Sequence, residues 1–84
     1  MATVFETRKR YRVAVYSNDH EPAHVHVVGK GREARFELNC PDGPVRYWDH
    51  YGFWKWSELS EIGEEIADHL PICCELWSKF HGEV

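Results

Sequence analysis

The chain has no long hydrophobic run, and this absence limits what kind of protein it is. Nowhere in its 84 residues does an apolar stretch approach the roughly 18–20 residues that a membrane-spanning helix needs. The first residues also lack the apolar segment of a secretory signal peptide. We therefore expect a soluble cytoplasmic protein. A chain of this length makes one domain, over residues 1–84.

Cysteine is also scarce, and its spacing matches no common metal-binding or redox motif. The chain contains Cys40, Cys73 and Cys74, an odd number with no Cys-x-x-Cys pair. This pattern argues against a zinc knuckle or a redox couple and favours a reducing cytoplasm. Adjacent residues on a helix point about 100° apart, so we expect Cys73 to face the core and Cys74 to lie at its boundary.

Basic residues are nearly absent from the last third of the chain. Residues 56–84 contain Lys79 as their one Lys or Arg against seven acidic residues, and the net charge of the chain is -4. This balance argues against a generally basic nucleic-acid binder and suits a partner with a basic surface. The one dense basic run, residues 8–12, is typical of a solvated hairpin turn. Contact of this run with nucleic-acid phosphates is a weaker alternative.

The first half of the sequence shows the period of two that is typical of strands. Residues 32–38 alternate most clearly, which places Ala34, Phe36 and Leu38 inward. A glycine-rich tight turn at residues 29–31 precedes them. Similar but shorter patterns predict strands at residues 3–5, 11–16, 24–28 and 45–48, the last at an edge. The pattern predicts an antiparallel sheet of four to five strands.

The second half has the period of a helix. Apolar residues recur at three- and four-residue steps from Ser57 onward: Leu59, Ile62, Ile66, Leu70, Cys73, Trp77 and Phe80. Ser57 is a suitable N-cap, and Pro71 either kinks one helix or opens a second. We favour two helices, with Gly82 ending the last. The expected fold class is α+β, with the sheet packed against a C-terminal helical pair or one kinked helix.

A histidine cluster is the feature of the sequence that most strongly suggests a chemical role. Three of the six histidines, His20, His24 and His26, lie within seven residues. Histidine is the commonest metal ligand and the usual acid or base near neutral pH, so these three are the candidate catalytic residues. Residues 20–24 also match the His-Glu-x-x-His zinc-protease motif formally. Pro22 and the strand pattern that follows argue against the helix that this motif requires.

The same cluster suggests a metal site that does not need a helix. We expect His24 and His26 to share one exposed strand face about 6.6–7 Å apart, a spacing that one zinc-like ion can bridge. His20, Asp19 or Glu21 would complete the site from the preceding loop. The candidate metal ligands are therefore His20, Glu21, His24 and His26. Metal-free acid–base chemistry remains an alternative, as does a structural or partner-binding role.

A second candidate surface lies at the junction between sheet and helix. Six aromatic residues occur within residues 47–56, too many for all to be buried. The helix that follows carries an acidic stripe suited to a basic partner, made by Glu58, Glu61, Glu65 and Asp68. The predicted partner surface consists of Trp54, Trp56, Glu58, Glu61 and Glu65.

These patterns together resemble a bacterial family catalogued as domain of unknown function 4160. The hallmark of that family is a His-x-Pro-Pro-His-x-His stretch, followed by a Gly-rich turn, an Ala-x-Phe-like strand, a Gly-Phe step and a helical tail. The matching residues here are 20–26, 29–31, 34–38, Gly52-Phe53, Leu59, Ile62 and Trp77. Ala23 replaces the second proline, and Pro71 with Cys73-Cys74 interrupts the tail. The resemblance implies a gene neighbour in an arrangement like a toxin–antitoxin pair.

Three hypotheses about function follow. The first is a small cytoplasmic prokaryotic protein that binds a partner protein, plausibly within a toxin–antitoxin-like two-gene module. The second is a metal- or histidine-dependent hydrolase or nuclease of such a module. The third is an acidic inhibitor from a mobile element that acts on a nucleic-acid-binding partner.

Overall fold

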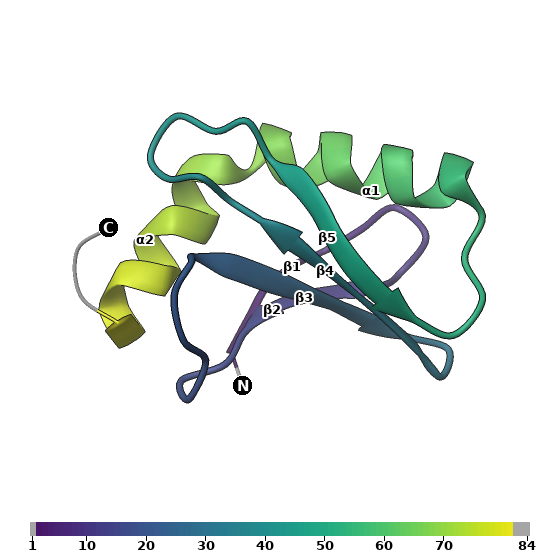
Figure 1. Cartoon of the computed structure of the whole chain (residues 1–84), viewed down its shortest axis with the longest axis horizontal. Helices are drawn as coiled ribbons and strands as arrows, with labels where there is room; N and C mark the ends of the chain where they lie inside the picture. Colours follow the sequence, from purple (N-terminus) through teal and green to yellow (C-terminus); the bar gives the residue numbers. More distant parts are fainter. Residues whose placement is uncertain (1, 82–84) are drawn as a thin grey trace.

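A computed structural model describes residues 2–81 and shows an α+β arrangement (Figure 1). Five strands precede two helices: β1 (Ala2–Glu6), β2 (Arg12–Val15), β3 (His24–Gly29), β4 (Arg32–Glu37), β5 (Arg46–Tyr51), α1 (Trp56–Asp68) and α2 (Leu70–His81). The strands form one sheet in chain order, and every neighbouring pair is antiparallel. The predicted fold class is confirmed.

The hairpin of β3 and β4 sets the register of the central sheet. Lys30 and Gly31 both have positive φ, 53° and 73°, as a two-residue type I′ turn requires. The turn pairs Val25 with Phe36 and Val27 with Ala34 across the two strands. These inward side chains are buried, as the period of two predicted.

The core lies between one face of the sheet and the apolar stripe of the helices. Figure 1 shows α1 along one side of the sheet and α2 at one end of it, where α2 contacts β1 and β2. The residues with no exposed surface are Val13, Ala14, Val15, Val25, Val27, Ala34, Leu38, Ile66, Cys73 and Trp77. The helical stripe therefore packs on the sheet as expected.

The helix boundaries differ slightly from the prediction. Lys55, and not Ser57, is the N-cap of α1, because the Glu58 carboxylate accepts a hydrogen bond from the Lys55 backbone N–H at 2.9 Å. Pro71 lies in the first turn of α2, where its missing N–H breaks no helical hydrogen bond, so two helices form. The predicted end at Gly82 falls outside the described residues. Within residues 2–81, neither helix combines the length and apolar character needed to cross a membrane.

The cysteines behave differently from what their count suggested. Cys40, in the loop after β4, forms a disulfide with Cys74 of α2, 34 residues later in the sequence. This pairing removes the cysteine-based argument for a reducing compartment. Cys73 faces the core as predicted, and its burial raises the pKa of its thiol to about 12. A thiol with that pKa stays protonated near neutral pH and is a poor nucleophile.

Candidate functional site

His24 and His26 lie on β3, but the expectation that their strand face is exposed is wrong. Their exposed fractions are 3% and 7%. Tyr16 stacks on the His26 ring at a centroid distance of 4.2 Å, and Trp48 contacts the His24 ring edge-on at 4.9 Å. Trp77 of α2 also contacts His24, at 5.3 Å. Aromatic side chains from distant segments therefore cover both imidazoles.

A carboxylate from the loop before β3 completes the cluster. Asp19 Oδ2 lies 2.9 Å from His26 Nε2 and 3.3 Å from His24 Nε2. One ligand atom from each of these three residues falls within 4.8 Å of the other two. Within the described part of the chain, this is the one set of three His, Cys, Asp or Glu residues placed to hold a metal ion. We refer to Asp19, His24 and His26 as the histidine site.

The second nitrogen of each imidazole also has a partner. The Nδ1–H of His24 donates to the Pro22 carbonyl oxygen at 2.8 Å, and the Nδ1–H of His26 donates to Glu33 Oε2 at 2.6 Å. These partners hold both rings in one orientation, with Nε2 directed at Asp19. Burial lowers the pKa of His24, which disfavours the charged form of this imidazole.

The structure separates the loop candidates that the sequence left open. His20 and Glu21 are exposed and lie outside the histidine site. Asp19 is the loop residue that reaches both rings. A regular strand reveals which side chains share a face, whereas the eight-residue loop between β2 and β3 has no periodicity and does not show which of its polar side chains turns inward.

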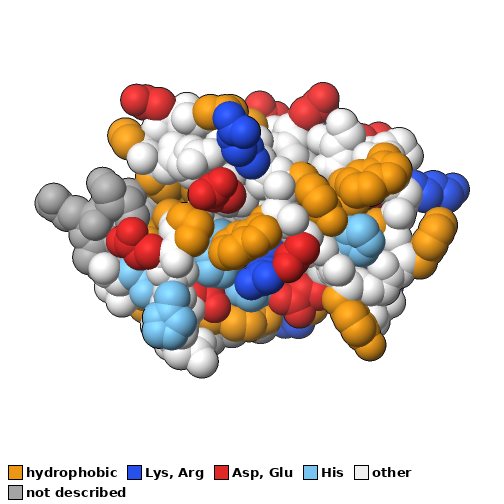
Figure 2. All heavy atoms as spheres, in the orientation of Figure 1, with side chains coloured by type: hydrophobic (Ala, Val, Ile, Leu, Met, Phe, Trp, Pro, Cys, Tyr) orange, Lys and Arg blue, Asp and Glu red, His pale blue; other side chains and the backbone are white. Residues whose placement is uncertain are grey.

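An ion pair flanks the histidine site on the same sheet face. Arg35 pairs with His26 across β3 and β4, and its guanidinium makes a two-point contact with the Asp49 carboxylate. The same guanidinium lies 4.4 Å above the Trp48 ring. Arg35 hydrogen bonding lowers the pKa of Asp49, which keeps that carboxylate charged. Figure 2 shows histidine, charged and hydrophobic side chains gathered near the middle of this face.

The predicted partner surface is only partly available. Trp54 is buried, because its ring packs against Tyr11 and its Nε1–H donates to the Glu33 carbonyl oxygen at 3.2 Å. Trp56, by contrast, is 66% exposed. Of the two tryptophans in the predicted partner surface, Trp56 is therefore the exposed one.

Several carboxylates of the acidic stripe on α1 already interact with basic residues of the same chain. Glu65 is buried and accepts a hydrogen bond from the Arg8 backbone N–H at 3.0 Å. The prediction that Glu65 belongs to the partner surface is therefore wrong. Two further ion pairs bind the stripe to basic residues, Lys9 with Glu61 at 3.2 Å and Arg32 with Glu58 at 3.3 Å. The basic run at residues 8–12 and the acidic stripe therefore meet each other, which weakens the interpretation of each as a separate docking surface.

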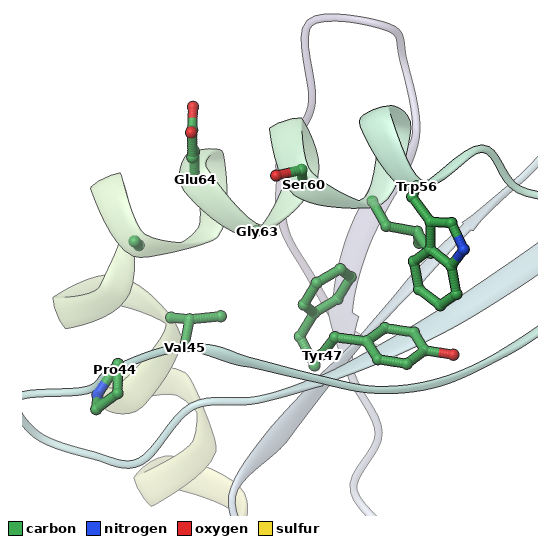
Figure 3. Close-up of a pocket in the computed structure, with 10 residues that line it drawn as sticks. Pro44, Val45, Tyr47, Trp56, Ser60, Gly63 and Glu64 are labelled. Carbon is green, nitrogen blue, oxygen red and sulfur yellow. The ribbon is translucent and has the colours of Figure 1, made fainter.

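An open apolar groove lies between β5 and α1 (Figure 3). Its volume is about 600 Å³. Its lining residues are Phe36, Pro44, Val45, Tyr47, Trp56, Leu59, Ser60, Gly63, Glu64 and Ala67. Tyr47 and Trp56 meet edge-on at one end, with ring centroids 5.3 Å apart. We call this feature the aromatic groove; sequence periodicity did not reveal it, because strand and helix each contribute only one wall.

The fold and the histidine site together define a small α+β domain in which two buried histidines and a half-buried aspartate meet on a five-stranded antiparallel sheet. A family model described as Domain of unknown function (DUF4160) matches residues 11–78, which is most of the chain. The chain therefore belongs to this family, as the resemblance in its sequence predicted. The matched segment includes the histidine site and the aromatic groove. No curated protein and no solved structure matches the chain.

Proposed function

We propose that this protein acts by binding a partner protein, plausibly the other component of a toxin–antitoxin-like two-gene module. The aromatic groove beside the edge strand β5 is the observation that carries this proposal. The occupant we propose is an extended basic segment of the partner, which would lie along β5 and place an apolar side chain in the groove.

The edge position of β5 supports an extended occupant. β5 pairs with β4 on one side, and no described strand pairs with its other side. A free strand edge offers backbone N–H and C=O groups to an added strand, while pockets beside the edge select alternate side chains. β5, the loop after it and the first residue of α1 also expose large aromatic side chains: Tyr47, Trp48, Tyr51, Phe53 and Trp56. Of these, Tyr47 and Trp56 line the aromatic groove, and exposed aromatic residues at a groove are typical of interface anchors.

Charge supports a basic occupant. Glu64 lines the aromatic groove and Asp68 is exposed at the end of the same helix. Neither carboxylate forms an ion pair within residues 2–81, in contrast to Glu58 and Glu61. A Lys or Arg of the partner would complement these free charges.

The proposal is tested by measuring the affinity of the groove for its partner. The protein that co-purifies from the native host would be isolated and titrated by calorimetry, together with a synthetic peptide of its most basic extended segment. We expect Trp56→Ala to weaken binding about 30-fold, as truncation of a hot-spot aromatic does. Phe53→Ala is the matched control, because Phe53 is exposed but does not line the groove. Equal affinities of wild type and Trp56→Ala, with unchanged circular dichroism, would contradict the proposal.

A metal- or histidine-dependent hydrolase or nuclease is the second candidate function. The observation that favours it is the position of His26 between two carboxylates, Asp19 at 2.9 Å and Glu33 at 2.6 Å. Carboxylates that hold an imidazole in one orientation are a recurring part of acid–base machinery. The acidic-inhibitor hypothesis has less support, because three carboxylates of its stripe are paired within the chain.

The enzyme hypothesis predicts a defined loss of activity. Hydrolysis of single-stranded RNA, single-stranded DNA and a phosphodiester model substrate would be measured with the purified protein. His26→Asn is expected to lower the rate about 100-fold, the lower range of what a general acid or base contributes. His20→Asn is the control, because His20 is exposed and outside the site. Retention of activity by a folded His24→Ala, His26→Ala double variant excludes this function.

A further inference from the structure

We propose that Asp19, His24 and His26 bind one divalent transition-metal ion, with zinc as the best match. The inference depends neither on the aromatic groove nor on hydrolysis, since an ion at this position also serves a purely structural role. It rests on an unpaired buried nitrogen, on the spacing of the ligand atoms and on the partners behind them.

The unpaired atom is Nε2 of His24. It is buried and has no hydrogen-bond partner, although Asp19 Oδ2 lies 3.3 Å away, because that contact lacks hydrogen-bond geometry. The Nδ1–H of the same ring already donates to the Pro22 carbonyl oxygen. In the neutral ring the Nε2 lone pair therefore faces an anionic oxygen. Two electron-rich atoms buried at this distance call for a cation between them.

Protonation of the imidazoles would satisfy fewer of the buried polar atoms in this site than a bound metal ion would. A proton on each nitrogen of His26 would satisfy Asp19 and Glu33, but it would leave His24 Nε2 unpaired. A proton on His24 Nε2 would itself lack a hydrogen-bond partner, because the contact with Asp19 Oδ2 does not have hydrogen-bond geometry. One divalent ion uses both Nε2 lone pairs and the Asp19 carboxylate at once.

The spacing of the ligand atoms fits tetrahedral zinc. Bonds of about 2.0–2.1 Å in tetrahedral geometry place neighbouring ligand atoms about 3.3 Å apart. The observed separations from Asp19 Oδ2 are 3.3 Å to His24 Nε2 and 2.9 Å to His26 Nε2. All three ligand atoms lie within 4.8 Å of one another, so one ion can contact them together. Two imidazoles and one carboxylate form a ligand set that zinc accepts, with the fourth position open to water.

The partners behind the ligands are those that metal sites commonly use. The imidazoles donate their Nδ1–H groups to a backbone carbonyl at Pro22 and to a carboxylate at Glu33. Such contacts fix the tautomer that leaves Nε2 free for the metal. Asp19 and Glu33 together supply two negative charges, which balance a divalent ion in a site where His24 and His26 are almost fully buried.

Titration with metal ions tests the proposal directly. Untagged protein would be stripped with a chelator, dialysed and titrated with Co²⁺ and Zn²⁺. We expect one equivalent of Co²⁺ per chain, with the visible absorption of tetrahedral cobalt, and displacement by Zn²⁺. We also expect Co²⁺ to quench tryptophan fluorescence, because Trp48 and Trp77 contact His24. Binding of less than one equivalent, or cobalt spectra of a hexa-aquo ion only, would overturn the proposal.

Matched variants assign the ion to these three residues. Asp19→Asn and His24→Gln are expected to weaken Zn²⁺ binding more than about 100-fold, and Glu33→Gln about 10–100-fold as an outer partner. His20→Gln and Glu21→Gln serve as controls and should bind as wild type does. Near-ultraviolet circular dichroism confirms that each variant folds. If His20→Gln weakened Zn²⁺ binding as much as His24→Gln, the assignment of the ion to Asp19, His24 and His26 would be wrong. Intact zinc binding without hydrolysis would remove the enzyme hypothesis and leave this site in place.

Discussion

Replacement of Trp77 by alanine is expected to lower the free energy of unfolding by about 3–5 kcal/mol. Trp77 is the largest side chain with no exposed surface, and it lies on α2 where that helix meets the sheet. Its ring stacks on His81 at 3.9 Å and contacts His24 at 5.3 Å. Truncation removes all of its apolar burial and leaves a cavity that the surrounding strands cannot close.

The effect would be large against the total stability of the domain. A chain of this size is stable by about 4–13 kcal/mol, so the variant loses roughly a quarter of that or more. Urea unfolding followed by circular dichroism measures the change. Trp56→Ala is the matched control, because the same substitution at a side chain that is 66% exposed should cost less than about 1 kcal/mol. A loss below about 1 kcal/mol for Trp77→Ala would contradict the core described here.

The Trp77 ring nitrogen predicts a different result for replacement by phenylalanine. Its Nε1–H is buried without a hydrogen-bond partner, which carries a desolvation cost of about 1–3 kcal/mol. Trp77→Phe removes that group and keeps an aromatic ring in the core. The phenylalanine variant should therefore be much closer to wild type in stability than the alanine variant.

Opening the Cys40–Cys74 disulfide is expected to cost about 3–4 kcal/mol, since in the chain-entropy model a closed loop of this length restricts the unfolded state by that amount. The bond joins residues 34 positions apart and ties the loop between β4 and β5 to α2. Thermal or urea unfolding with and without dithiothreitol measures the difference. The same loop supplies Pro44 and Val45 to the aromatic groove, so reduction should also loosen one wall of that groove.

A double variant isolates the disulfide from other effects of the reductant. Cys40→Ser, Cys74→Ser should be as unstable as the reduced wild type, and dithiothreitol should not change its stability further. Thiol titration of the unfolded, unreduced wild type should find one thiol, that of Cys73. Wild-type stability that does not respond to dithiothreitol would contradict a bond formed in solution.

Much of the fold could be predicted because its signals are local. The alternation of valines in β3 and of Ala34, Phe36 and Leu38 predicted which face packs inward, and the residues are buried as expected. Side chains of a strand alternate between two faces regardless of what lies far away in the sequence. The position of Pro71 likewise predicted a break between two helices, because proline is tolerated only in the first turn.

The candidate site was predictable only in part. The strand pattern correctly placed His24 and His26 on the face opposite the valines, but it could not show that Tyr16, Trp48 and Trp77 would cover them. Those covering side chains come from three other segments of the chain. The inward turn of Asp19 has the same explanation, since its position depends on loop geometry and on the rings that it meets.

The sequence by itself determined the fold class, the hairpin and helix positions, the family and the strand face that carries the histidines. These features follow from short-range periodicity, turn chemistry and a local motif. The tertiary structure alone decided the burial of the histidine site, the choice of Asp19 over His20 and Glu21, and the pairing of Cys40 with Cys74. It also decided that Trp54 is buried while Trp56 is exposed. Each of these outcomes depends on segments that meet only after folding, because burial is a property of the packed chain and not of a residue's neighbours in sequence.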